Sequence, residues 1–198
     1  MPSTSRTATC GAAQGTAGVH RRQPDRRPER ARPRPAHGDE LDAVGPYPVL
    51  AFAPGYTVTF VAAEPGPVLD DRGGLTLTAT ASYADLPHPD MVVVPGGPGT
   101  AGALSDRRLL GWLGRAHERT RWTTSVCSGS LLLGAAGLLK GRKATTHWGW
   151  LEQLAVFGAE PVSERVVTDG RLVTAAGVSA GIDMALTGVT GGRGWSGR

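Results

Sequence analysis

The stretch from Trp122 to Leu139 constrains the fold more than any other part of this 198-residue chain. It begins with a β-branched, half-apolar run, passes through Cys127 and a Ser-Gly pair, and ends in an apolar run rich in Ala and Leu that suits a helix. Cys127 is therefore predicted at a strand-to-helix turn, where helix amides favour a thiolate and small neighbours admit a substrate. A buried structural cysteine is the alternative reading.

A glycine-rich loop is predicted to lie beside this cysteine. Met91 to Val94 is an apolar run of the kind buried on both faces of a parallel sheet, and Pro95 to Thr100 follows it. An amphipathic helix around residues 109–116 then leads to the Trp122 strand. Because such crossovers are right-handed, the loop and Cys127 should share the carboxyl edge of the sheet. The backbone N–H groups near Gly97 and Ser128 could then hold a developing negative charge.

The remaining patterns fill out one α/β domain over residues 39–188. Helices are predicted over 41–51 and 148–157 and from Ser179 to Leu186, and a strand is predicted over 56–61. Hairpins are predicted over 67–80 and 166–174, the second turning at Asp169-Gly170.

Both ends of the chain are predicted to be disordered. Residues 1–38 form an Arg/Pro-rich arm without apolar periodicity, and residues 189–198 form a Gly-rich tail. The arm explains the net charge of +4: residues 1–40 hold eight of the 21 basic and four of the 17 acidic side chains, so the rest carries thirteen of each sign. A neutral domain argues against a nucleic-acid partner.

Two cysteines in unlike contexts provide no disulfide framework, and no segment has the length of a membrane span or the apolar region of a secretory signal. We therefore expect a cytoplasmic protein with no membrane partner. The histidines show no metal-ligand spacing, so no metal site is predicted.

Several motifs together resemble the ThiJ/PfpI family of the class I glutamine amidotransferase-like superfamily. They are VVVPGGPGT, SVCSGSLLLGAAGLLKGRKATTHW, FGA and VVTDGRLVTAAGVSAGIDMAL, in this order. Within the family they look most like the isonitrile hydratase branch and the sensor domains of AraC-type regulators. The resemblance implies a flavodoxin-like three-layer sandwich with a mostly parallel central sheet, a homodimer, a small-molecule substrate and no cofactor.

The resemblance also assigns roles to individual residues. Cys127 matches the family nucleophile, and Gly96 and Gly97 with Ser128 match the oxyanion or substrate-binding positions. Asp42, in LDAVGP, matches the acid that hydratases place against the sulfur. Protease-like members carry His where this chain has Ser128, which argues against peptide hydrolysis. His147 is a secondary candidate, either as a proton donor or as a packed, hydrogen-bonded residue.

The activity implied is that of a cysteine-dependent hydro-lyase. The Cys127 thiolate would attack the terminal carbon of an isocyanide, an acid would protonate the adduct to a thioimidate, and water would release an N-substituted formamide. Two alternatives are a non-catalytic ligand-sensing module, although nothing after Leu186 resembles a helix-turn-helix, and a redox-responsive thiol.

One departure from the family concerns the first strand. Relatives open with an apolar strand just before the LDAVGP helix, whereas this chain has Arg-Pro repeats over residues 32–38. Proline at two of these positions is incompatible with a central strand. The first strand is therefore predicted to be missing.

Overall fold

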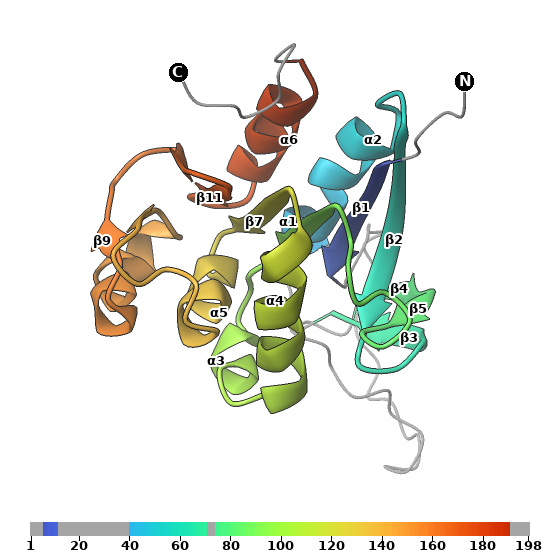
Figure 1. The fold of residues 1–198 in the computed structure, drawn as a ribbon, viewed down its shortest axis with the longest axis horizontal. Coiled ribbons are helices and arrows are strands. Elements are labelled where there is room, and N and C mark those ends of the chain that lie inside the picture. Colours follow the sequence, from blue (N-terminus) through green and yellow to red (C-terminus); the bar gives the residue numbers. More distant parts are fainter. Residues whose placement is uncertain (1–5, 12–39, 71–73, 191–198) are drawn as a thin grey trace, which may run out of the picture.

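The structure is a computed structural model that describes residues 6–11, 40–70 and 74–190. Its main sheet has seven strands in the order β10-β11-β7-β6-β1-β2-β5 (Figure 1). These strands are β1 (Arg6–Gly11), β2 (Tyr56–Ala62), β5 (Ala81–Ser82), β6 (Met91–Val94), β7 (Trp122–Val126), β10 (Val166–Asp169) and β11 (Leu172–Ala175). All neighbours are parallel except the β10–β11 hairpin. The predicted α/β class with a mostly parallel sheet is confirmed.

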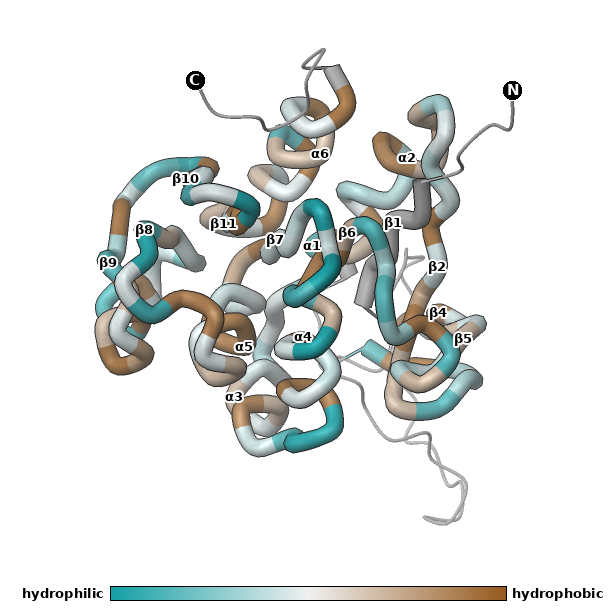
Figure 2. Tube along the Cα trace, viewed as in Figure 1, coloured by the Kyte–Doolittle hydropathy of each residue, from teal (hydrophilic) through white to brown (hydrophobic). Residues whose placement is uncertain are grey.

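Helices cover both faces of the sheet, which gives three layers. One face carries α1 (Glu40–Val44), α2 (Pro46–Ala51) and α6 (Ala180–Thr190); the other carries α3 (Thr100–Ala103), α4 (Arg107–Arg119), α5 (Gly129–Ala135) and the 3-10 helix η2 (Trp148–Phe157). Alternate residues of β6 enter opposite cores, Met91 and Val93 on the α6 side and Val92 and Val94 on the α5 side. In Figure 2, the buried helix α5 is mostly hydrophobic, whereas the ends of the more exposed helix α4 are hydrophilic.

Two short pairs of strands lie outside the main sheet. β3 (Gly66–Leu69) and β4 (Thr76–Ala79) form the antiparallel hairpin predicted over residues 67–80, and β8 (Lys143–Ala144) pairs in parallel with β9 (Glu160–Pro161). The helix predicted over 41–51 is interrupted at Gly45, where an added Cβ would lie 2.6 Å from the carbonyl oxygen of Leu41.

The first strand is present, which corrects the prediction that it is missing. β1 lies between β6 and β2, with Ala8 opposite Met91 and Cys10 opposite Phe60. The composition of the whole arm predicts disorder here because Arg and Pro outweigh the four-residue run of Thr, Ala and Cys inside β1, and because the family pattern places the first strand directly before α1. The rest of the predicted arm, residues 12–38, lies outside the described residues.

The C-terminal helix also extends further than predicted. α6 continues to Thr190, past the expected domain boundary at residue 188, because Val189 packs against the core cluster on that face. Tertiary packing here outweighs the low helix propensity of Gly188. The predicted tail beyond residue 190 lies outside the described part of the chain.

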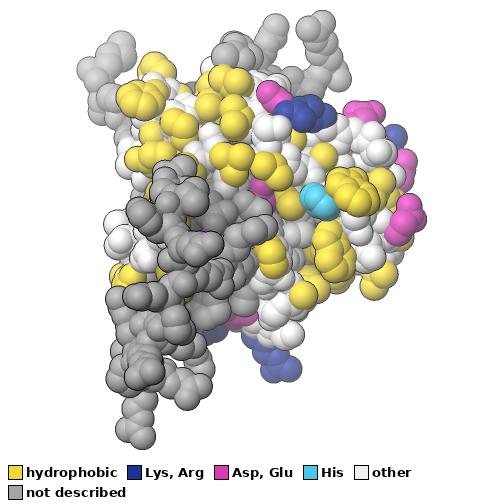
Figure 3. All heavy atoms as spheres, turned by 180° about the vertical axis from the view of Figure 1, so that it is seen from behind, with side chains coloured by type: hydrophobic (Ala, Val, Ile, Leu, Met, Phe, Trp, Pro, Cys, Tyr) yellow, Lys and Arg dark blue, Asp and Glu magenta, His cyan; other side chains and the backbone are white. Residues whose placement is uncertain are grey.

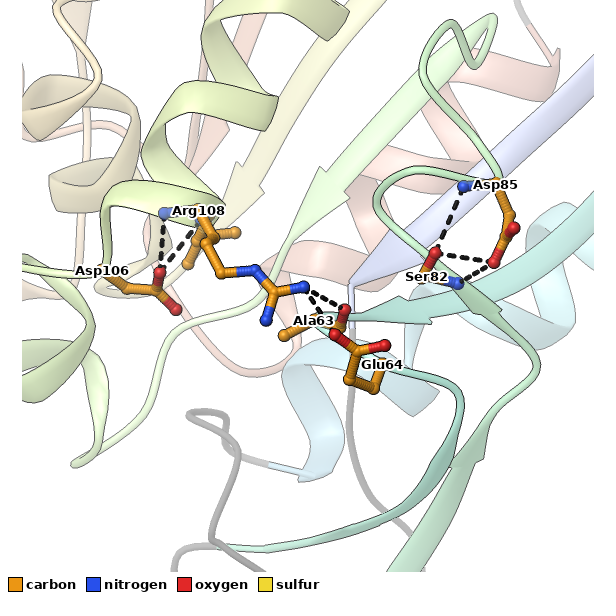
Figure 4. Close-up of polar contacts among 7 residues, drawn as sticks. Ala63, Glu64, Ser82, Asp85, Asp106 and Arg108 are labelled. Carbon is orange, nitrogen blue, oxygen red and sulfur yellow. Dashed lines mark hydrogen bonds and ion pairs between the residues drawn. The ribbon is translucent and has the colours of Figure 1, made fainter.

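Polar contacts fix the start of α4 to the end of β2 (Figure 4). Asp106 caps α4 by accepting from the backbone N–H groups of Arg108 and Leu109 at 2.9 and 3.1 Å. The Arg108 side chain reaches the Ala63 carbonyl oxygen at 2.9 Å and the Glu64 carboxylate at 2.6 Å. The contacts of the Arg108 side chain are exposed and serve to position α4.

Candidate active site

Cys127 occupies the predicted turn between β7 and α5. Its φ of 56° lies in the left-handed region, which few non-glycine residues adopt. Three hydrogen bonds to the backbone of Cys127 hold this conformation. Cys127 N donates to the Ala175 carbonyl oxygen at 2.9 Å, while the Cys127 carbonyl oxygen accepts from Thr146 Oγ1 at 2.9 Å and Ser130 Oγ at 3.3 Å. The strained backbone is thus fixed from three neighbouring segments.

Asp42 is the buried acid of the site and connects three segments. Its side chain is fully buried in α1. One carboxylate oxygen accepts from Gly96 N at 3.1 Å and the other from Val178 N at 3.1 Å. Two N–H donors stabilise the ionised form of a carboxyl group. Asp42 therefore has the environment of a buried carboxylate placed beside the cysteine.

The structure reverses the expected ionisation of Cys127. Burial raises the pKa of its thiol to about 12, and the charge of Asp42 and its hydrogen bond with the thiol act in the same direction. Hydrogen bonds from Ser128 lower the pKa but do not compensate. From the sequence we expected only the helix amides to act on the thiol, and these lower its pKa. In the structure, burial and the neighbouring Asp42 have the larger effect and raise the pKa. The resting cysteine is therefore a thiol, so attack by the sulfur requires a base.

The glycine-rich loop after β6 (residues 95–100, the glycine loop) reaches the turn at Cys127 (the cysteine elbow), but the N–H groups of Gly96 and Gly97 already donate to other protein atoms. Gly97 N donates to Ser128 Oγ at 2.9 Å, and Thr100 Oγ1 lies 2.9 Å from the same oxygen. Gly96 N is bound to Asp42. The predicted adjacency of loop and elbow is therefore present. The two glycine amides hold Asp42 and Ser128 in place, and the N–H that faces the sulfur is that of Ser128.

Close backbone approach requires glycine on both sides of this junction. A Cβ added at Gly96 would lie 2.4 Å from Ser128 N, and one added at Gly129 would lie 2.2 Å from the Val94 carbonyl oxygen. Neither distance is compatible with a side chain, so these glycines permit the contact between loop and elbow.

A pocket of about 430 Å³ adjoins the cysteine at Gly177. A methyl group placed at Gly177 would lie 3.8 Å from the Cys127 sulfur and 3.5 Å from the Cδ2 atom of His147. Figure 3 shows, on the rear face, a histidine side chain among hydrophobic ones. The pocket is lined by Thr145, Thr146, His147, Trp148, Leu151, Ser163, Glu164, Arg165, Ala176, Gly177, Val178 and Ala180.

Three residues of the site were missed from the sequence. Thr146 holds the Cys127 carbonyl group, Val178 supplies an N–H to Asp42, and Gly177 leaves open the space between pocket and sulfur. A signal for two of them existed: residues 176–178 follow strand β11, which neighbours β7, so the carboxyl-edge rule applied to them as well.

Among the described residues, no group of three or more His, Cys, Asp and Glu side chains could hold a metal ion. Within the same ranges, every helix is too short or too polar to span a lipid bilayer.

The sequence matches the model of the DJ-1/PfpI family over residues 36–190. It is 46% identical to an isonitrile hydratase from Pseudomonas putida over 148 residues, covering 75% of this chain and 64% of that protein. It is 30% identical to the HTH-type transcriptional regulator CdhR of Pseudomonas aeruginosa over 128 residues, 64% of this chain and 38% of the regulator. The chain thus spans less than two thirds of the length of these relatives.

A solved structure of a ThiJ/PfpI family protein from Pseudomonas syringae has a similar fold. It aligns with a TM-score of 0.74 at 42% sequence identity, covering 78% of this chain and 64% of that one.

Proposed function

Because this chain belongs to the DJ-1/PfpI family, we propose that it hydrates an isocyanide to an N-substituted formamide, with Cys127 as nucleophile and Asp42 as acid and base. The observation that carries the proposal is the fully buried Asp42 carboxylate beside the Cys127 thiol. The similarity to an isonitrile hydratase supports this reaction over others in the family. Ser128, in place of a histidine, provides no second base next to the sulfur.

In the first half of the reaction, Asp42 moves one proton. It accepts the proton of the Cys127 thiol while the sulfur attacks the terminal carbon of R–N≡C, and then delivers that proton to the same carbon. The product is the thioimidate R–N=CH–S–Cys127, which contains every atom of thiol and isocyanide. Since burial disfavours the free thiolate, the proton transfer to Asp42 coincides with attack.

In the second half, water adds to the thioimidate carbon. The tetrahedral intermediate R–NH–CH(OH)–S–Cys127 collapses to the formamide R–NH–CHO, and the proton of its hydroxyl group returns to the sulfur through Asp42. The Ser128 N–H remains directed at the sulfur throughout and stabilises negative charge there.

The test uses the purified protein and phenyl isocyanide. We expect stoichiometric conversion to N-phenylformamide, followed by chromatography and mass spectrometry. The Cys127→Ala variant should produce none while its circular dichroism spectrum and melting temperature stay close to those of the parent. Turnover retained in Cys127→Ala would refute the mechanism.

The similarity to a transcriptional regulator supports a second candidate, a ligand-sensing module that uses the same pocket. A sensor would bind phenyl isocyanide, seen as a raised melting temperature, without producing formamide. The raised pKa of Cys127 disfavours the redox-responsive alternative, because the thiolate is the form that peroxide oxidises. Intact mass after mild peroxide treatment tests it: a gain of two oxygens on Cys127 without isocyanide turnover would favour that reading.

The homodimer expected from the family resemblance stays a prediction. Hydrophobic side chains gather on the rear face over α2 and α6 (Figure 3). Among the large hydrophobic residues, Tyr47 in α2, Phe52 at the end of α2 and Leu186 in α6 are exposed. Sedimentation equilibrium of the purified protein should give twice the 20.5 kDa chain mass; a monomer at all concentrations would contradict it.

A further inference from the structure

The indole of Trp148 is 83% exposed, although it lines the pocket that adjoins Cys127. Trp148 begins η2, and its ring lies against the imidazole of His147, with 5.3 Å between the ring centroids and 36° between the ring planes. A large, flat apolar surface is therefore held in a defined place at the pocket, and most of it is left open to a ligand.

The helix η2 places Leu151 next to this indole. In a 3-10 helix the side chains at positions i and i+3 eclipse one another, so Trp148, Leu151 and Leu154 form one row. The row runs from solvent into the protein: Trp148 is exposed, Leu151 is half-buried, and Leu154 is fully buried in the core on the α5 side. Trp148 and Leu151 both line the pocket. They give it one apolar wall that begins at the surface and leads inward.

The pocket that contains this wall reaches the nucleophile at Gly177. A methyl group placed at Gly177 would lie 3.8 Å from the Cys127 sulfur, so this position is the gap between sulfur and pocket. In the proposed thioimidate R–N=CH–S–Cys127, the substituent R is joined to the sulfur through the carbon and nitrogen atoms and therefore extends beyond the gap. Asp42 is fully buried and is not part of the pocket lining, so R has room on the pocket side. There it meets the apolar wall.

Another part of the pocket lining is polar. It consists of Ser163, Glu164 and Arg165, directly before β10. The Arg165 guanidinium group donates from Nε to the Asp183 carboxylate and from Nη2 to Ser179 Oγ, the second bond at 3.0 Å. Since its charge is paired with Asp183, Arg165 attracts an anionic substituent only weakly, and the Glu164 carboxylate repels one. The lining therefore favours an uncharged R with an apolar face.

Resting on the proposed isocyanide hydration, we propose that Trp148 is the specificity-determining residue of the site and that the preferred substrates are uncharged aryl isocyanides. The aromatic ring of R lies against the Trp148 indole and Leu151, in the offset or edge-to-face arrangement that aromatic pairs favour. A branched alkyl substituent such as tert-butyl presents no flat face and gains less from the indole. Because Trp148 contacts a part of the substrate that does not react, it affects KM and leaves kcat unchanged.

The chain provides a matched control for Trp148. Trp150 lies on the same helix and is 46% exposed, but it is outside the pocket lining and off the row formed by Trp148 and Leu151. The variants are Trp148→Ala, Trp148→Phe and Trp150→Ala. Each should keep a melting temperature close to that of the parent, because neither indole belongs to the buried core.

The experiment measures KM and kcat for phenyl isocyanide and tert-butyl isocyanide. We expect Trp148→Ala to raise the KM for phenyl isocyanide by on the order of 10-fold, with kcat near that of the parent, and to change the KM for tert-butyl isocyanide by less than about 2-fold. Trp148→Phe should keep most of the preference because it retains an aromatic ring. Trp150→Ala should resemble the parent with both substrates.

Three kinetic results would overturn the assignment. An unchanged KM for phenyl isocyanide in Trp148→Ala would show that R lies elsewhere. An equal rise in the KM for both isocyanides would show that the indole does not distinguish an aromatic ring. A lower KM for isocyanoacetate than for phenyl isocyanide in the parent would show that the site selects an anionic substituent.

Binding without turnover separates this assignment from the proposed function. In the Cys127→Ala background, calorimetry should give a Kd for N-phenylformamide, the expected product, that rises by on the order of 10-fold when Trp148→Ala is added. Absence of formamide in the parent protein would remove the proposed function, whereas an unchanged Kd would remove the aryl-binding role of Trp148.

Discussion

The two ends of strand β7 carry buried polar clusters that differ in one respect. At the amino end, Thr123 Oγ1 lies 2.8 Å from His117 Nδ1 and 2.9 Å from Thr120 Oγ1, so the hydroxyl groups and the imidazole bind one another. At the carboxyl end, the Cys127 thiol faces the Asp42 carboxylate, two groups that compete for one proton. The carboxyl end adjoins a pocket, through Gly177.

This comparison teaches where chemistry can occur on a sheet that helices cover on both faces. The cluster around Thr123 joins α4 to β7 by satisfying its own donors and acceptors. At Cys127 the strand ends, and a buried acid–thiol pair remains reactive because the thiol proton has two alternative positions. Substitutions at the carboxyl end should therefore affect activity, and those at the amino end should affect stability.

The largest effect is expected for Asp42→Asn. Loss of the base should lower kcat/KM for phenyl isocyanide by about 10²- to 10⁴-fold. Loss of the negative charge should at the same time lower the pKa of Cys127, so that iodoacetamide alkylates it faster at pH 8. The two assays should thus move in opposite directions; slower alkylation in the variant would contradict the geometry of the pair.

Gly96→Ala tests the packing at the carboxyl end. The added Cβ would lie 2.4 Å from Ser128 N, and we expect a loss of about 3 kcal/mol in the free energy of unfolding, measured by urea titration. Gly114→Ala is the matched control, since no atom lies within 4 Å of its added Cβ in helix α4. That variant should gain about 1 kcal/mol from helix propensity. Equal effects in both would show that the junction is loosely packed.

Thr123→Val probes the amino end. It preserves side-chain shape but leaves His117 and Thr120 without their shared hydroxyl partner, so unfolding should become easier by about 1–3 kcal/mol. Turnover per folded molecule should equal that of the parent. A specific loss of kcat would break the proposed division between the two ends of β7.

The smallest effect concerns pH. Burial, followed by the charges of Arg171 and Arg142, holds the pKa of His117 below its usual 6.5. Because the His117 pKa is lower in the folded state, the unfolded chain takes up the proton first as the pH falls. The free energy of unfolding is therefore unaffected by His117 above pH 6.5, and it decreases as the pH falls from 6.5 toward the folded pKa. The urea midpoint should therefore be lower at pH 5 than at pH 7.5. His117→Gln should show a smaller difference, and an equal difference would assign the pH dependence to other groups.

The sequence predicted the elements that depend on local pattern. The β-branched run before Cys127 and the apolar run after it indicated the elbow, and the continuous apolar run at Met91 indicated a strand buried on both faces; both are present. The family resemblance added Asp42, which the structure places at the cysteine. Strand β1 could not be predicted, because a short run of Thr and Ala acquires strand structure only when β2 and β6 supply hydrogen-bonding partners on both sides.

The sequence by itself thus determined the α/β class, the position of the turn at Cys127 and the family, since these follow from residue order along the chain. The tertiary structure alone decided the chemistry of the site. It brings Val178 to Asp42 across 136 residues, commits the amides of Gly96 and Gly97 to internal partners, and raises the pKa of the thiol. Ionisation depends on burial and on charges nearby in space, and neither is fixed until distant segments of the chain pack together.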